Sequence, residues 1–238
     1  MSHHSSSESV PKTIEEFRGS ERVVERPCDE VFPNIKLQAW TSHGDGCLVI
    51  IPTENEDKVN LFRAKLQQKK PSNIALQFLC IRTSDDGYSQ SFDEQGKTCA
   101  EKRVWKVANT FNENYSDYLE DNRIGTVLFA VIESFFQLSN VERPVDAAVI
   151  VVHNAMTGQT EAGVSKGVTL HPAFVEEARS RGFVYGDQER CRTTAGEVVA
   201  ERIKDVDKAN WQEPASGKSR YEIVGERIEA MNIPWNAK

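Results

Sequence analysis

Apolar and polar residues recur along the chain with different periods, and each period predicts an element. Alternation in single steps is typical of a half-buried strand, an unbroken apolar run of a buried strand, and spacing of three or four of a helix. Residues 35–40 alternate, whereas residues 47–51 and 74–81 are almost wholly apolar. Thr53 and Glu56 form a capping box between the two apolar runs. We therefore expect the first two strands to form a hairpin, followed by a helix and a parallel third strand.

The middle of the chain has the most regular apolar spacing. Six residues recur at helical intervals: Ile124, Val127, Leu128, Val131, Ile132 and Phe135. This spacing predicts a buried helix over residues 124–135. Residues 103–108, before this helix, and residues 145–152, after it, are expected to be strands. The helix and the strand that follows it would belong to a second β–α–β unit.

Helix signals dominate the last third of the chain. Pro172 suits the first turn of a helix, and two further capping boxes begin at Thr194 and Ser219. Residues 212–218 are expected to be a linker between the last two helices. The whole pattern predicts an α/β (or α+β) protein, with a mixed, partly parallel sheet flanked by helices and a helical C-terminal third.

The same pattern divides the chain into three parts. Residues 1–12 are rich in Ser and His and are expected to be a flexible N-terminal arm. Residues 13–211 are expected to be a single α/β domain. Residues 212–238 would be a linker and a C-terminal helix packed on that domain.

The charge and the cysteines limit the partners and the cellular compartment that we expect. The chain has 29 Lys and Arg against 36 Asp and Glu, a formal net charge of −7. A negative protein is repelled by a phosphate backbone, so the charge argues against nucleic acid. Its longest apolar run, residues 127–132, is far shorter than the roughly 20 residues that span a bilayer, so no membrane partner is expected. Five scattered cysteines and an N-terminus without an apolar core predict a reducing, cytoplasmic location.

Nucleotide and metal motifs are incomplete in this sequence. The first strand-to-helix turn, residues 52–57, has no glycine and carries three carboxylates, which disfavours a phosphate. Gly158 and Gly163 have the spacing of a phosphate loop, but Val164 stands where that loop needs Lys. His3 and His4 are not joined by a second pair at ligand spacing. We therefore expect no nucleotide, no cofactor and no metal.

Three residues are candidates for catalysis. His153 directly follows the strongest predicted strand, and the loop 154–167 comes after it. Cys191, beside two arginines, is the cysteine that is expected to be most exposed and most readily activated. His171 is the remaining partner for a Cys-His hydrolase. The alternative for His153 is a structural histidine that is hydrogen-bonded to a neighbouring loop.

Two tryptophans are candidates for contact with other proteins. Trp211 and Trp235 each follow a predicted helix in a polar or terminal context. Each ring either packs its helix end onto the core or anchors a partner. Without a complete catalytic motif, the sequence favours a non-enzymatic structural or interaction subunit of an intracellular assembly, a class that includes viral proteins. It would bind itself or other proteins. The alternative is a hydrolase or transferase with its site around His153 and the loop 154–167.

Overall fold

Two long apolar strands form the centre of a mixed sheet. β5 (Ile124–Gln137) and β6 (Val145–Asn154) are antiparallel neighbours, paired from Leu128 to Gln137 of β5. Nearly all of their side chains are buried on both faces of the sheet. Because both faces are covered, neither strand shows the apolar–polar alternation of a half-exposed strand.

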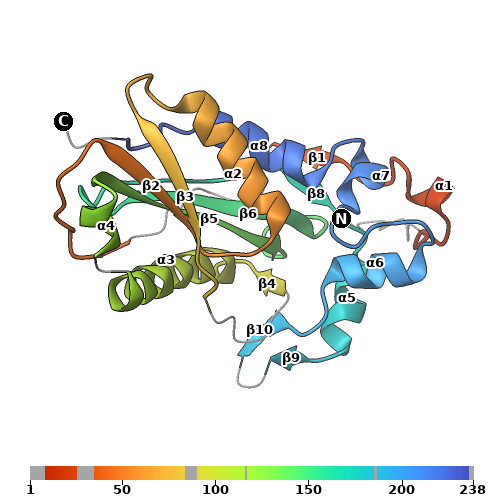
Figure 1. The fold of residues 1–238 in the computed structure, drawn as a ribbon. Helices are drawn as coiled ribbons and strands as arrows, with labels where there is room; N and C mark the ends of the chain where they lie inside the picture. The colour runs from red at the N-terminus through yellow and green to blue at the C-terminus, as the bar shows by residue number, and fades with distance from the viewer. Residues whose placement is uncertain (1–8, 26–34, 84–89, 116, 185–186, 236–238) are drawn as a thin grey trace.

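The computed structural model describes residues 9–25, 35–83, 90–115, 117–184 and 187–235 (Figure 1). The other strands are β1 (Val23–Val24), β2 (Gly46–Ile51), β3 (Ala75–Cys80), β4 (Gln90–Phe92), β7 (Thr160–Val164), β8 (Gly167–Thr169), β9 (Phe183–Val184) and β10 (Asp187–Cys191). The helices are α1 (Ile14–Phe17), α2 (Glu56–Lys69), α3 (Gln95–Asn114), α4 (Tyr118–Asp121), α5 (Pro172–Ser180), α6 (Ala195–Arg202), α7 (Gln212–Ser216) and α8 (Arg220–Ala230).

The helix predicted over residues 124–135 is wrong, because these residues form β5. Their burial is nevertheless as expected, since Val127 and Val131 are at most 1% exposed. A strand that is buried on both faces places apolar residues at every position, and a helical subset can always be drawn from such a run. Its β-branched residues favour the strand. The second β–α–β unit is therefore a β-hairpin of β5 and β6.

The first β–α–β unit is confirmed. β2 and β3 are parallel and paired over six residues, and α2 connects them. The helix begins two residues later than a Thr53 cap would place it, because the Asn55 side chain accepts the cap hydrogen bond from the Lys58 backbone. The hairpin of residues 35–40 with β2 is wrong, since residues 35–40 form no strand and β2 pairs in parallel with β5.

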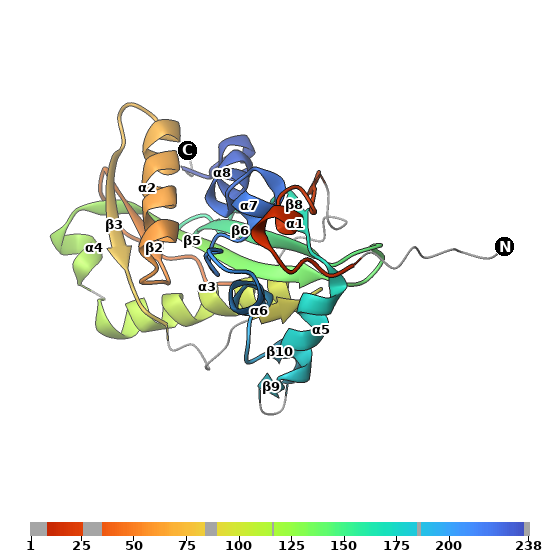
Figure 2. The ribbon, with the colours of Figure 1, turned by 90° about the vertical axis from the view of Figure 1, so that its right-hand side faces the viewer.

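Helices cover both faces of the sheet, which confirms the predicted α/β class. α2 and α8 lie on one face and α3 on the other (Figure 2). The strand predicted over residues 103–108 is wrong, because these residues belong to α3. A third apolar cluster joins α1, α5, α6 and α7 around Phe136, near the end of β5. None of the helices in the described part of the chain combines the length and the apolar character that a bilayer crossing requires.

The helical signals of the last third are largely confirmed. Both capping boxes form, at Thr194 of α6 and at Ser219 of α8. The predicted linker, residues 212–218, instead contains the short helix α7. Residues 1–8 of the predicted arm lie outside the described residues.

Candidate functional site

A break in strand pairing along one edge of β5 defines the site. β6 occupies the other edge, so β2 and β4 must share this one. β2 pairs as far as Phe129 and β4 begins at Phe135, and on this edge no described strand pairs with the residues between them. The Lys58 ammonium donates to the Ile132 carbonyl oxygen across 3.0 Å. The Lys58 side chain thus binds a carbonyl group of β5 that a neighbouring strand would otherwise bind.

A cavity of about 320 Å³ opens at this break. Residues from both faces of the sheet line it, because no strand separates the faces there. Its charged lining residues are Lys58, Arg103, Glu133, Asp146, Glu197, Lys208 and Arg220. Four cations against three carboxylates give the cavity a net positive charge in a chain whose net charge is −7.

On the α3 side of the break, Glu133 and Arg103 form a close ion pair. Arg103 Nε donates to Glu133 Oε2 across 2.6 Å, and both side chains are mostly buried. Charge-assisted hydrogen bonds of this length are among the stronger ones in proteins. The pair holds the guanidinium of α3 at the edge of β5, where Arg103 also lines a second cavity of about 120 Å³.

On the opposite face, Asp146 is the most buried carboxylate of the cavity. Arg220 Nη2 lies 3.2 Å from both of its oxygens, and Gln212 Nε2 donates to Oδ2. Burial raises the pKa of Asp146 above its ordinary value, while Arg220, Gln212 and Lys58 act in the opposite direction. A carboxylate with a raised pKa can accept a proton near neutral pH more readily than an exposed one.

Three helix N-termini converge on the cavity. Asn55 caps α2, Thr194 caps α6, and Arg220 begins α8, and all three residues line the cavity. Each N-terminus carries a partial positive charge and backbone N–H groups without helical partners. Together with the cations, these termini make the cavity suited to an anionic ligand.

Two aromatic residues that border the cavity, Trp211 and Phe136, are almost fully buried, and a glycine beside them allows a neighbouring loop to approach α6. Trp211 and Phe136 lie stacked, with ring centroids 6.3 Å apart. A Cβ on Gly196 would lie 2.4 Å from the Lys208 carbonyl oxygen. Only a residue without a side chain lets this loop approach α6, so Lys208 reaches Glu197 at 3.1 Å.

The predicted catalytic residues do not lie in this cavity. His153 is 0% exposed, lies 2.7 Å from the Thr160 hydroxyl through Nδ1, and stacks on Phe129. Burial lowers its pKa to about 4, so the ring is neutral at pH 7. This geometry is that of the structural histidine weighed as the alternative. The loop 154–167 forms the β6–β7 hairpin.

The expectation that Cys191 is exposed and activated is wrong. The thiol is 0% exposed in the apolar cluster around α5 and α6. Burial raises its pKa to about 11, which leaves it protonated at neutral pH. His171 caps α5, where its Nδ1 accepts from the Ala173 backbone. These positions do not provide the thiolate that a Cys-His hydrolase requires.

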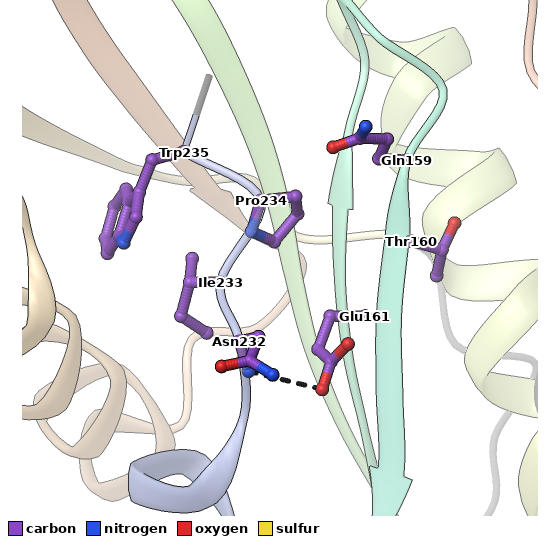
Figure 3. A pocket seen from close by; sticks show the side chains of 7 residues that line it. All are labelled: Gln159, Thr160, Glu161, Asn232, Ile233, Pro234 and Trp235. Atoms are coloured by element: carbon purple, nitrogen blue, oxygen red, sulfur yellow. Dashed lines mark hydrogen bonds between the residues drawn. The ribbon is translucent and has the colours of Figure 1, made fainter. Parts of the chain in front are cut away.

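The two predicted anchors differ in exposure. Trp211 is 2% exposed and packs against the core, which is the packing alternative that the sequence left open. Trp235 is half-buried and borders a second hollow of about 540 Å³ between the C-terminal segment and β7 (Figure 3). There the Asn232 backbone donates to Glu161, which alone among the described lining residues carries a charge. This hollow therefore lacks the converging cations of the main cavity.

The charged residues that line the cavity come from elements that are distant in the sequence. Lys58, Arg103, Asp146 and Arg220 belong to four different elements, and no short motif contains two of them. The described residues contain no group of three His, Cys, Asp or Glu side chains that could hold a metal ion. Asn55 of the predicted turn 52–57 lines the cavity and Lys58 follows that turn directly, whereas Arg103 and Arg220 come from distant parts of the chain.

Comparisons with known proteins bear on the fold. No family model matches the sequence, and no curated protein matches it. A solved structure, protein VC0702 from Vibrio cholerae, is similar over 76% of this chain and 91% of that chain, with a TM-score of 0.54 and 16% identity. This similarity supports the α/β fold with a mixed, partly parallel sheet.

Proposed function

We propose that the protein is an enzyme that hydrolyses a phosphorylated small molecule in the cavity at the β5 break. The observation that carries this proposal is the convergence of Lys58, Arg103 and Arg220 with the buried carboxylate of Asp146. The hydrolase alternative from the sequence is thereby kept, but its site moves from His153 to this cavity. The non-enzymatic subunit stays a prediction.

Anion binding is the first part of the proposal. A phosphoryl group spreads negative charge over several oxygens, and guanidinium and ammonium groups from different directions match that distribution. Arg103 approaches from α3, and Lys58 and Arg220 approach from α2 and α8.

Hydrolysis is the second part. A water oxygen bonds to phosphorus, its proton passes to the Asp146 carboxylate, and the bond from phosphorus to the leaving oxygen breaks. The leaving oxygen takes its proton from solvent. Asp146 suits the role of base because its pKa is raised, and Arg220 keeps the carboxylate in one orientation.

Phosphate release tests the proposal. The purified chain is incubated with Mg²⁺ and a panel of sugar phosphates, nucleoside phosphates and inorganic pyrophosphate. We expect at least one substrate to be hydrolysed, and Arg103→Met and Asp146→Asn to lower kcat/KM at least a hundred-fold. Arg22→Met is the matched control, since Arg22 is 73% exposed outside the cavity.

Three outcomes would contradict the proposal. The first is no hydrolysis anywhere in the panel. The second is ligand binding in calorimetry without turnover, which would indicate a receptor. The third is turnover that survives both cavity variants. The nucleoside phosphates of the panel also test the expectation that nucleotides do not bind.

A further inference from the structure

The strand β3 presents an unprotected edge. Within the described residues it pairs with β2 alone, so its other side has no strand partner. Its sequence, Ala-Leu-Gln-Phe-Leu-Cys, contains no charge and no proline, and all six residues are partly or well exposed. Natural edge strands are usually protected by charges, proline or bulges. Figure 2 shows β3 at one side of the molecule, beside α2.

We infer that two copies of this chain pair through their β3 edges, antiparallel, about a two-fold axis at Phe78. The sheets of the two copies would then continue into each other. Antiparallel partners lie on the same face of a sheet, so Phe78 meets its own counterpart and Leu76 lies opposite Cys80 of the second copy. Each residue from Leu76 to Cys80 thereby meets an uncharged neighbour, and Ala75 lies beyond the overlap of the two strands.

The charges of α2 favour a second copy over another partner. Arg63 lies over the Phe78 ring, 5.8 Å from its centroid, and marks the level of the proposed axis on the helix. Glu56 precedes Arg63 by seven residues, and Lys70 follows it by seven. A two-fold axis at Arg63 places Glu56 of each copy at the same height along the strands as Lys70 of the other copy. One such pair lies at each end of the contact. An unrelated strand would carry no such matching pair.

The size of the contact sets the expected affinity. A five-residue ladder, Leu76 to Cys80, with two flanking helices is smaller than the roughly 1,600 Å² of a standard stable interface. We therefore expect a reversible dimer that dissociates on dilution, with a dissociation constant of about 10–100 μM.

Sedimentation equilibrium between 5 and 500 μM tests the inference on the full chain. The wild type should approach twice its monomer mass at the highest concentration. The double variant Ala75→Lys/Cys80→Lys should weaken association at least ten-fold, because it places four like charges along the shared edge. Ala75 and Cys80 are exposed, so the fold should persist, as far-UV circular dichroism would verify. The matched control is Asn109→Lys/Asn112→Lys, on the exposed side of α3.

Crosslinking tests the register. With Phe78 on the axis, the two Cys80 residues are offset by four positions, about 14 Å along the strand. A thiol-reactive crosslinker of about that span should join Cys80 to Cys80, as identified by mass spectrometry, and a direct disulfide should not form. A wild type that stays monomeric at 500 μM would overturn the inference. So would a dimer that is unaffected by the edge lysines, or a dimer without the Cys80 crosslink.

Discussion

The pair of Asp146 and Arg220 allows a sharp test of the electrostatics of the cavity. The Asp146 side chain is 4% exposed and the Arg220 side chain 24% exposed, with 3.2 Å between Nη2 and each carboxylate oxygen. Arg220→Met removes the charge and keeps much of the side-chain volume. Asp146 is left with Gln212 and with the more distant charge of Lys58.

The expected loss of stability follows from this geometry. Breaking a buried ion pair by removing one partner typically costs about 3–5 kcal/mol. Because Arg220 is partly exposed and Gln212 still donates to Asp146, we expect about 2–3 kcal/mol at pH 8. The double variant Asp146→Asn/Arg220→Met should recover at least half of this loss, since it leaves no unpaired charge.

The pH dependence has a definite sign. The folded pKa of Asp146 is raised above its ordinary value, so its ionisation weakens the folded state as pH rises through that pKa. Without Arg220 the folded pKa is higher still, and the weakening extends to higher pH. The loss caused by Arg220→Met should therefore be smaller at pH 4 than at pH 8. Urea denaturation at the two pH values measures it, and an equal loss at both, or no recovery in the double variant, would refute the reasoning.

Three further predictions concern single residues. Gly196→Ala should cost about 1–3 kcal/mol in urea denaturation and weaken turnover, because the new Cβ would collide with the Lys208 carbonyl. Since the folded pKa of His153 is about 4, stability should fall by up to about 3 kcal/mol as pH drops from 6.5 to 4, and His153→Phe should flatten that part of the profile. Iodoacetamide at pH 7.5 should modify the exposed Cys80 and leave Cys191 unmodified in the native protein, as peptide mass spectrometry would show.

The parts of the fold that local chemistry determines could be predicted from the sequence. Two uncharged apolar runs that flank a polar, helix-forming stretch identify β2, α2 and β3. The capping boxes at Thr194 and Ser219 locate the starts of α6 and α8 to the residue. In each case the physical cause lies within a few residues of its effect, so neighbours in the sequence are sufficient.

The wrong prediction at β5 arises because its structure depends on contacts with residues that are distant in the sequence. Whether a wholly apolar stretch is a strand or a helix depends on the elements that cover it, and those are distant in the sequence. β5 is buried by α3 on one face and by α2 and α8 on the other. Gly125 and the β-branched residues that follow it favour a strand, whereas the spacing of Val127, Val131 and Phe135 favours a helix. The capping box predicted at Thr53 was also misplaced, since Asn55 caps α2 instead.

The cavity could not be predicted from the sequence, because it lies at the break in strand pairing along one edge of β5. β2 stops where Pro52 follows Ile51, and β4 joins β5 only at Phe135, so the break depends on pairing between distant segments. One local signal nevertheless pointed to the site. A capping box shows where a helix begins, and a helix start is where positive potential gathers. Thr194 of one box and Arg220, which follows Ser219 of the other, line the same cavity, so the helix starts indicate its place better than any single histidine or cysteine does.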